Sequence, residues 1–172
     1  TLAYNTTGAQ NVGIGQSALL SNTTASYNTA VGYEAGYSNT TGGITALGQA
    51  AGRSNTTGLA NIAVGQAALF SNTTSNSNVA VGNFSQYPTT GTFNTSIGDA
   101  SLRFNTTASS NTALGASALF NNTTASNNTA VGYQAGYSNS TGTGNLCVGY
   151  QAGYYSTGSY NTFVGPLNTS GN

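Results

Sequence analysis

Asn28-Thr29-Ala30-Val31-Gly32 is one copy of a five-residue block that recurs along the whole chain. Its final glycine falls at positions 15, 32, 48, 65, 82, 98, 115, 132, 149 and 165, so that the copies are 16 or 17 residues apart. The residue before this glycine is always aliphatic, and the residue four positions before it is asparagine in nine of the ten copies. Self-similarity at a fixed short period indicates stacked units, none of which can bury an apolar face alone.

Alternation within the block predicts a short β-strand in each unit, with Thr29 and Val31 on one face and Ala30 on the other. A second short segment, such as residues 33–37, is predicted as another strand, followed by a turn rich in Asn, Thr and Gly over residues 38–42. We therefore expect an all-β, parallel β-solenoid: one array over residues 1–172, with about ten coils of 16–17 residues. At a strand spacing of about 4.8 Å, the coils would span roughly 45–50 Å.

Stacked coils place like residues in columns. The aliphatic column is predicted to form the core inside the coils, and it comprises Ile14, Val31, Leu47, Val64, Val81, Ile97, Leu114, Val131, Val148 and Val164. An asparagine column is predicted at a corner of the coil, and it comprises Asn11, Asn28, Asn61, Asn78, Asn94, Asn111, Asn128, Asn145 and Asn161, with Ile44 as the exception. On this prediction the intervening alanine column points outward, where small side chains would let another chain approach; the alternative is that it points inward at a narrow corner. Its members are Ala30, Ala46, Ala63, Ala80, Ser96, Ala113 and Ala130.

The coils are grouped in threes, because many features return after 50 residues. Tyr37, Tyr87 and Tyr137 are separated by this interval, and so are Arg53 and Arg103. Duplication of a three-coil block explains the superperiod, and so does a partner or bend that every third coil meets. Both explanations stay open at this point.

Composition excludes several classes of function. Four charged side chains make up 2% of the residues, whereas an ordinary globular domain has about 25%. Two arginines cannot form the basic surface that nucleic acids need. Without His or Lys, and with Glu34 and Asp99 about 19 Å apart along the predicted stack, the chain lacks an acid–base pair, which argues against a β-helical polysaccharide enzyme. We expect no catalytic residues, no metal site and no cofactor.

Two further features also have plain structural interpretations. Cys147 has no cysteine partner in the chain and replaces an alanine of the repeat, which predicts a small buried residue. Thirteen Asn-x-Ser/Thr sequons occur, and we interpret them as turn chemistry repeated in every coil rather than as glycosylation sites. No apolar run has the length of a membrane span.

A column of bulky residues lies five positions after each glycine. It begins at Leu20 and continues with Tyr37, Arg53, Phe70, Tyr87, Arg103, Phe120, Tyr137 and Tyr154. The column is either a ligand surface that stacks on sugar rings or a packing stripe, within the chain or between chains; its Leu and Phe members favour packing. Glu34 and Arg53 are placed to pair across adjacent coils, and Asp99 and Arg103 lie close along one coil.

Neither end of the array has a capping sequence. Asn5-Thr6-Thr7 is a turn without a preceding strand, and Asn168-Thr169-Ser170-Gly171 stops within a coil. Solenoids normally cover their open ends. We therefore expect a segment of a longer array, or a subunit whose ends stack on other subunits.

The stretch Asn128-Thr129-Ala130-Val131-Gly132-Tyr133-Gln134-Ala135-Gly136-Tyr137-Ser138 resembles repeats of phage tail-fibre and adhesin-like proteins. It is similar, more loosely, to the head repeats of trimeric autotransporter adhesins, which have a shorter period. The resemblance extends over essentially the whole chain. It implies an extracellular, cell-surface or virion-surface fibre, built as a left-handed parallel β-roll and usually trimeric.

The sequence therefore predicts a structural fibre segment, a rigid β-rod that mediates adhesion, with itself as partner in a homotrimer or an end-to-end filament. The alternatives are a self-assembling extracellular filament subunit and an adhesin head that binds a cell-surface glycan or receptor. An ice-binding protein is a less favoured alternative, because the column three positions before the glycine mixes Thr with large aliphatics. We expect no nucleic-acid partner and no membrane span.

Overall fold

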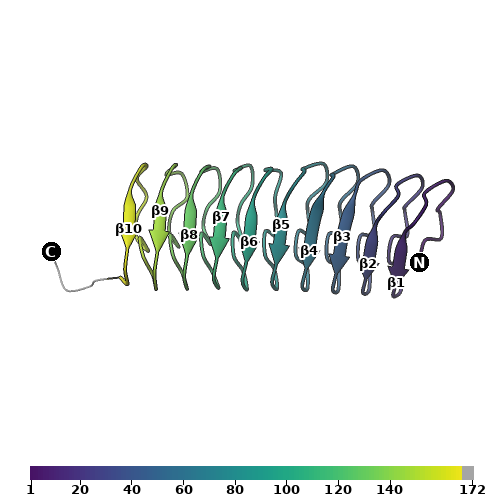
Figure 1. Ribbon diagram of the computed structural model, residues 1–172, viewed down its shortest axis with the longest axis horizontal. Coiled ribbons are helices and arrows are strands. Elements are labelled where there is room, and N and C mark those ends of the chain that lie inside the picture. Colours follow the sequence, from purple (N-terminus) through teal and green to yellow (C-terminus); the bar gives the residue numbers. More distant parts are fainter. Residues whose placement is uncertain (168–172) are drawn as a thin grey trace.

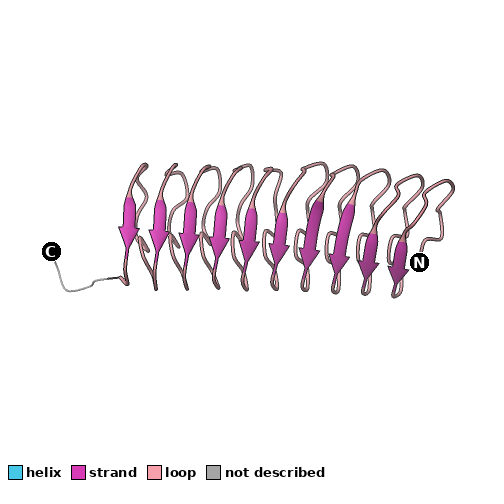
Figure 2. Cartoon of the chain, in the orientation of Figure 1, coloured by secondary structure: helices cyan, strands magenta, loops and turns pink. Residues whose placement is uncertain are grey.

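The structure is a computed structural model that describes residues 1–167, in which ten short strands stack in chain order into one parallel sheet (Figure 1). The strands are β1 (Val12–Ile14), β2 (Thr29–Val31), β3 (Ile44–Leu47), β4 (Asn61–Val64), β5 (Val79–Val81), β6 (Thr95–Ile97), β7 (Thr112–Leu114), β8 (Thr129–Val131), β9 (Leu146–Val148) and β10 (Thr162–Val164). Residues 1–167 contain no helix, and loops close each coil (Figure 2). The predicted β-solenoid is confirmed. The turn Asn168–Gly171, on which the expectation of an uncapped C-terminal end depends, lies outside the described residues.

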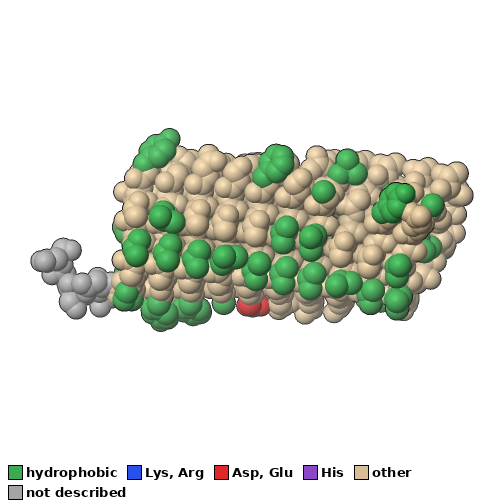
Figure 3. Space-filling model, viewed as in Figure 1, with side chains coloured by type: hydrophobic (Ala, Val, Ile, Leu, Met, Phe, Trp, Pro, Cys, Tyr) green, Lys and Arg blue, Asp and Glu red, His purple; other side chains and the backbone are tan. Residues whose placement is uncertain are grey.

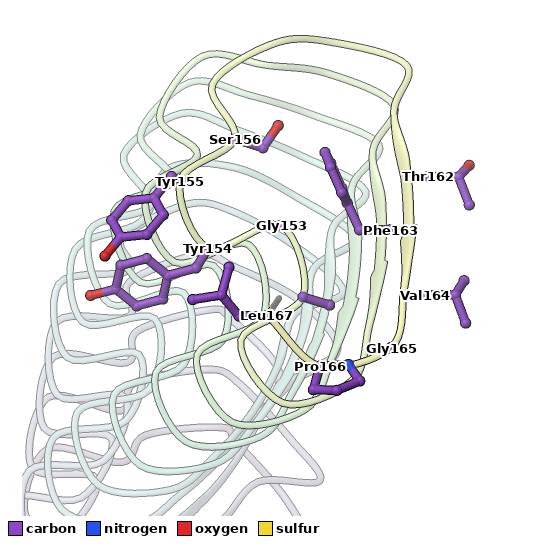
Figure 4. A pocket seen from close by; sticks show the side chains of 11 residues that line it. Gly153, Tyr154, Tyr155, Ser156, Thr162, Phe163, Val164, Gly165, Pro166 and Leu167 are labelled. Carbon is purple, nitrogen blue, oxygen red and sulfur yellow. The ribbon is translucent and has the colours of Figure 1, made fainter. Parts of the chain in front are cut away.

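The coils wind left-handed. In Figure 1 the strands run downward on the near side while the chain progresses from right to left. Viewed from the C-terminal end, the chain turns clockwise as it approaches the viewer (Figure 4). Each strand begins at the upper edge of the rod in Figure 1 and ends at the lower edge.

Every strand pairs in register with the next, so that the repeated residues form straight columns. Ala30 lies opposite Ala46, and Ala46 lies opposite Ala63. Two features require glycine after each strand: a positive φ angle and the close approach of the backbone of the next coil. Gly32 has φ +137°, and a Cβ on it would lie 2.5 Å from the carbonyl oxygen of Gly48. No side chain fits between coils at this point, which explains why every copy of the block ends in glycine.

The prediction that the aliphatic column forms the core is wrong. Its members lie on the outer face of the sheet, half-buried or exposed, and Ile14 and Val164 near the two ends are 58% and 74% exposed. The alanine column faces inward instead, and all seven members have 0% exposure. The prediction that aliphatic residues and alanines lie on opposite faces of the strand is therefore correct. The prediction of which face points inward is wrong.

The narrow interior is the physical reason for this exchange. The alanines of the strands share the interior with a second set of small residues on the opposite wall, including Ala18, Ala35, Ala51 and Ala68. Val, Ile and Leu side chains do not fit into both walls of so thin a coil. Interiors are packed without space for extra methylenes, so the smaller face turns inward.

Leucine side chains pack beside glycines of neighbouring coils inside the rod. A Cβ on Gly36 would lie 3.0 Å from Leu19 Cδ2, and a Cβ on Gly136 would lie 2.9 Å from Leu119 Cδ2. The side chain of one coil thus fills the space left by the glycine of the next. The pair recurs after 100 residues, whereas at the intermediate 50-residue position Gln86 takes the place of the glycine beside Leu69.

Ile44 interrupts the asparagine column for the same reason. It is 3% exposed, and a Cβ on Gly52 would lie 2.2 Å from Ile44 Cδ1. Its backbone N–H still donates to Asn28 Oδ1 at 2.7 Å, which keeps the coil in register without an asparagine at this position.

The segment after each glycine is not a strand, contrary to prediction. In residues 33–37, Glu34 has φ +54° and Gly36 has φ +57°. The Glu34 N–H donates to Gln16 in the preceding coil, whereas the Gly36 N–H donates to Ala51 in the following coil. Left-handed residues at every second position replace the extended conformation by successive tight turns.

A polar cluster divides the interior into two apolar cores. One core extends from Ala18 to Ala80 and the other from Leu102 to Ala152. Between them Gln86 Nε2 donates to Ser96 Oγ at 2.8 Å, and Ser85 lies 3.1 Å from Ser101. We call Ser85, Gln86, Ser96 and Ser101 the polar seam.

The hydrogen-bond ladder between coils also changes near this seam. The N–H groups of residues 56–58 all donate to Thr73 in the next coil. Within the described chain, the equivalent N–H groups of residues 73–75 donate to no backbone carbonyl of the next coil, whose turn at residues 88–91 is one residue shorter.

The reversed faces can be tested with one pair of substitutions in β4. We expect Ala63→Leu to lower the free energy of unfolding by about 2 kcal/mol, because the larger side chain must enter a filled interior. Val64→Leu, on the outer face of the same strand, should change it by less than about 0.5 kcal/mol. Urea unfolding followed by circular dichroism measures both values. Equal effects of the two substitutions would contradict the orientation described.

Candidate functional site

Asparagine amides form two hydrogen-bonded columns along the rod. In the predicted corner column, the Asn94 N–H donates to Asn78 Oδ1 at 3.0 Å, and the Asn111 N–H donates to Asn94 Oδ1 at 3.0 Å. The Asn94 Nδ2 donates in turn to the carbonyl of Ala108 at 2.9 Å. These side chains are buried and paired, so the corner column stabilises the stack and presents no ligand site.

The sequon asparagines of the turns form the second column. Asn39 and Asn55 have no exposed surface, and each Nδ2 donates to a carbonyl three residues further on, at 3.0 Å in both cases. Asn55 Nδ2 also donates to Asn39 Oδ1 at 2.9 Å. The turn threonines continue the pattern, because the Thr56 hydroxyl donates to the carbonyl of Thr73 at 3.0 Å. Sequons in this column therefore serve as turn chemistry, and their amides are inaccessible in the folded chain.

The column of bulky residues is a half-buried stack along the outside of the turns. Phe70 and Tyr87 stack with their ring centroids 5.1 Å apart, and Phe120 and Tyr137 stack at 5.0 Å with an interplanar angle of 6°. Tyr154 continues the second stack at 4.9 Å from Tyr137.

The two arginines extend these stacks. The Arg53 guanidinium lies 5.1 Å from the Tyr37 ring and 5.6 Å from the Phe70 ring. The Arg103 guanidinium lies 5.4 Å from Tyr87 and 4.5 Å from Phe84. Because the faces of the stacked rings cover one another, the column lacks the free ring faces that sugar stacking requires. Contact of this column with a second chain stays a prediction.

The expected ion pair between adjacent coils is present. Arg53 Nε donates to Glu34 Oε2 at 2.6 Å. This hydrogen bond lowers the pKa of the Glu34 carboxyl below its ordinary value and raises the pKa of the Arg53 guanidinium. Within residues 1–167, Asp99 and Arg103 form no such pair. Both members of the Glu34 pair are partly solvated, so the pair contributes little to stability.

Cys147 takes an alanine position inside the rod, as predicted. It lies opposite Ala130 in the neighbouring strand and is 2% exposed. Burial raises the pKa of its thiol, which disfavours the reactive thiolate. The side chain is structural.

A hollow lies on the last described coil (Figure 4). It has a volume of about 550 Å³ and is lined by Tyr154, Tyr155, Phe163 and Leu167, among others. Phe163 points into the interior at a position where other coils have alanine, and packs against the apolar core. The lining contains no acid–base pair, and within the described chain no further coil covers it.

The sequence analysis missed one group of exposed aromatic residues. Tyr27, Phe93 and Tyr160 are 78%, 65% and 84% exposed, and each directly precedes a residue of the corner asparagine column. They lie just before β2, β6 and β10, on the side of the rod where the strands begin, which we call the upper edge. All three directly precede a corner asparagine in the sequence. Most coils have a small or polar residue at this position, so the repeat shows no aromatic column there.

No protein-family model, no curated protein and no solved structure matches this chain. Among residues 1–167 no helix is long and apolar enough to cross a membrane. The described chain also brings no three His, Cys, Asp or Glu side chains together.

The stacked column should contribute measurably to stability. Phe120 contacts Tyr137 face to face and Phe104 edge to face, at 5.0 Å in both cases. We expect Phe120→Ala to lower the free energy of unfolding by about 2 kcal/mol, because it removes two ring contacts and opens the stack. Phe93→Ala is the matched control, since this ring is exposed; its effect should stay below about 0.5 kcal/mol. If denaturant titrations give the same loss of unfolding free energy for both substitutions, the stack does not contribute to stability.

The Glu34–Arg53 pair predicts a small pH dependence of known sign. Because the folded-state pKa of Glu34 is lowered, its contribution is present above the pKa of the unfolded chain and is lost as pH falls through the folded value. We expect Glu34→Gln to lower thermal stability slightly at neutral pH, by less than about 1 kcal/mol. The difference from wild type should shrink as the pH falls and vanish once the Glu34 carboxyl is protonated in the folded chain. A difference that persists in acid would refute the assignment to the ion pair.

Proposed function

We propose that this chain is a non-catalytic structural segment of an extracellular, cell-surface or virion-surface fibre. The observation that supports this proposal best is the continuity of the columns along the rod. In-register strands, two asparagine columns and the stacked outer column all follow one axis. Such a rod resists bending and local opening, because each coil is bonded to both neighbours.

The surface also suits a structural role outside the cell. The chain has two acidic and two basic residues, so its fold hardly depends on the ionic strength or pH of the surroundings. Most buried asparagine and serine side chains are hydrogen-bonded inside the coils, so these polar groups stabilise the rod.

The partner that we propose is a second and third copy of the chain, in a homotrimer. The outer sheet face exposes two rows of Val, Ile, Leu and Thr side chains, and none of the ten strands contains a charged residue. Hydrophobic side chains follow this face along the length of the rod (Figure 3). One of these rows is aliphatic in every coil, and a continuous exposed apolar row favours association. Copies side by side would cover these strips along the whole rod.

Electron microscopy and sedimentation of the purified chain test the proposal. Short rods with the mass of three chains support the homotrimer. Long filaments of one chain's width would support end-to-end assembly instead, and isolated single rods at high concentration would contradict self-association.

A charge on the sheet face should separate the chains without unfolding them. We expect Val31→Asp combined with Ile97→Asp to convert the oligomer to monomers, because carboxylates on the outer face would be desolvated in the interface. The control is Gln66→Glu combined with Asn83→Asp, which adds the same charge at exposed positions after the strands. Analytical ultracentrifugation should show monomers for the first variant only. Unaltered association of the first variant would exclude this face as the interface.

A further inference from the structure

The three exposed aromatic residues of the upper edge have the geometry of a binding surface. We name Tyr27, Phe93 and Tyr160 the edge aromatics. Within the described chain no aromatic ring or guanidinium stacks on any of them, and the Tyr160 ring lies against the backbone at Gly144. This distinguishes them from the stacked column on the turns. Hydrophobic side chains stand as separate groups along the upper edge in Figure 3.

Folding does not account for aromatic residues at these positions. Tyr27, Phe93 and Tyr160 have φ values of +62°, +58° and +59°. A bulky residue in this left-handed region is strained, and these exposed rings gain little burial in return. The equivalent positions of other coils have the same conformation without a ring, as in Gln10, Ala60, Ser77, Ser110 and Asn127.

The backbone holds the edge aromatics rigidly. The Tyr27 N–H donates to Ala9 of the preceding coil at 3.1 Å, and the Tyr160 N–H donates to Thr143 at 2.8 Å. Phe93 donates in the same way to Asn76, at 3.3 Å. The rings are therefore presented on a fixed frame, and a ligand that binds them orders no loop.

The rings are evenly spaced along the rod. They precede β2, β6 and β10, so each is four coils from the next. At a strand spacing of about 4.8 Å, this places them about 19 Å apart along one straight edge. A row of equally spaced flat apolar rings matches a ligand that is itself linear and repeating, such as a polymer.

A shallow groove adjoins the first of the rings. The coil that ends at Gly43 lacks the residue that other coils have before the corner asparagine, because Ile44 follows directly. The resulting groove has a volume of about 320 Å³ and is lined by Ser26, Tyr27, Ile44, Asn61 and Ile62, among others. It combines the Tyr27 ring with the hydroxyl groups of Ser26 and Thr45, whereas the Asn61 amide is buried.

The surroundings of the rings are polar and uncharged. The residues next to them along the edge are Ser, Thr, Asn, Ala and Gly. Glu34 and Asp99 follow their strands at the opposite edge, and the two arginines lie in the stacked column. An acidic polymer would find no cation at the upper edge, so charge favours a neutral ligand.

We propose that the upper edge binds a linear neutral polysaccharide, whose sugar rings lie with their apolar C–H faces on Tyr27, Phe93 and Tyr160. Aromatic faces carry negative partial charge and attract polarised C–H groups. The hydroxyl and amide groups between the rings supply hydrogen bonds to sugar hydroxyls. The proposal goes beyond the structural role of the rod and requires no association of copies.

The test measures the binding of the purified chain to cellulose, chitin, xylan and mannan by co-sedimentation and affinity electrophoresis. We expect wild type to bind at least one of these polymers. Tyr27→Ala, Phe93→Ala and Tyr160→Ala should each weaken this binding by roughly 2- to 10-fold, and the triple variant by about 30-fold or more. The matched control replaces Tyr33, Tyr133 and Tyr150, three exposed tyrosines at the lower edge, by alanine. This variant should bind within about twofold of wild type.

Ligand length provides a second readout. Disaccharides reach a single ring, whereas a long chain spans all three, so affinity should rise with length in wild type and much less in the triple variant. Binding that the triple variant retains would overturn the proposal. So would failure of folded wild type to bind any of the four polymers, or a preference for polygalacturonate. Sedimentation of the same samples reports self-association separately, so a monomer that binds polysaccharide contradicts only the proposed homotrimer.

Discussion

In-register parallel stacking is the constraint on which the rest of the structure depends. Each side chain has a counterpart at the same position of the coils about 4.8 Å above and below it, so a residue type is favoured where it packs or pairs with those counterparts. Amides satisfy this condition because Nδ2 donates while Oδ1 accepts, as Asn55 and Asn39 do. Flat aromatic rings satisfy it by stacking, as Tyr137 and Tyr154 do. Columns of like charges would repel, and the chain accordingly has two acidic and two basic residues.

The thin coil imposes the second constraint. Its interior accommodates alanine on both walls, and some of its leucines fill the space beside a glycine of the neighbouring coil, as Leu19 does beside Gly36. Large aliphatic residues are consequently displaced to the outer sheet face. The apolar surface that a globular domain would bury within itself is thus left available for contacts with other chains. The narrow interior and the apolar exterior therefore have the same cause.

Much of this fold could be predicted from the sequence because the period alone determines the coil. The recurrence of Asn28–Gly32 gave the strands, their parallel order and their register. Alternation predicted that Val31 and Ala30 lie on opposite faces of the strand. It did not predict which of them faces inward, because that depends on the width of the coil. The turns at residues 33–37 were predicted as a strand because the positive φ of Glu34 cannot be recognised from its residue type. The same holds for Leu19 in the preceding coil. The edge aromatics occur in only three coils, so they do not stand out as a feature of the repeat.

The polar seam has a mechanical consequence for the rod. Gln86 Oε1 is buried without a hydrogen-bond partner, and so is Asn72 Oδ1, where Thr89 stands in place of the next turn asparagine. Apolar packing is interrupted at the same level, between Ala80 and Leu102. In a one-dimensional stack, stability is a sum over neighbouring interfaces, and the weakest interface is where the stack separates first. Tension along the axis would therefore divide the rod near its middle, into two halves that each keep an intact apolar core.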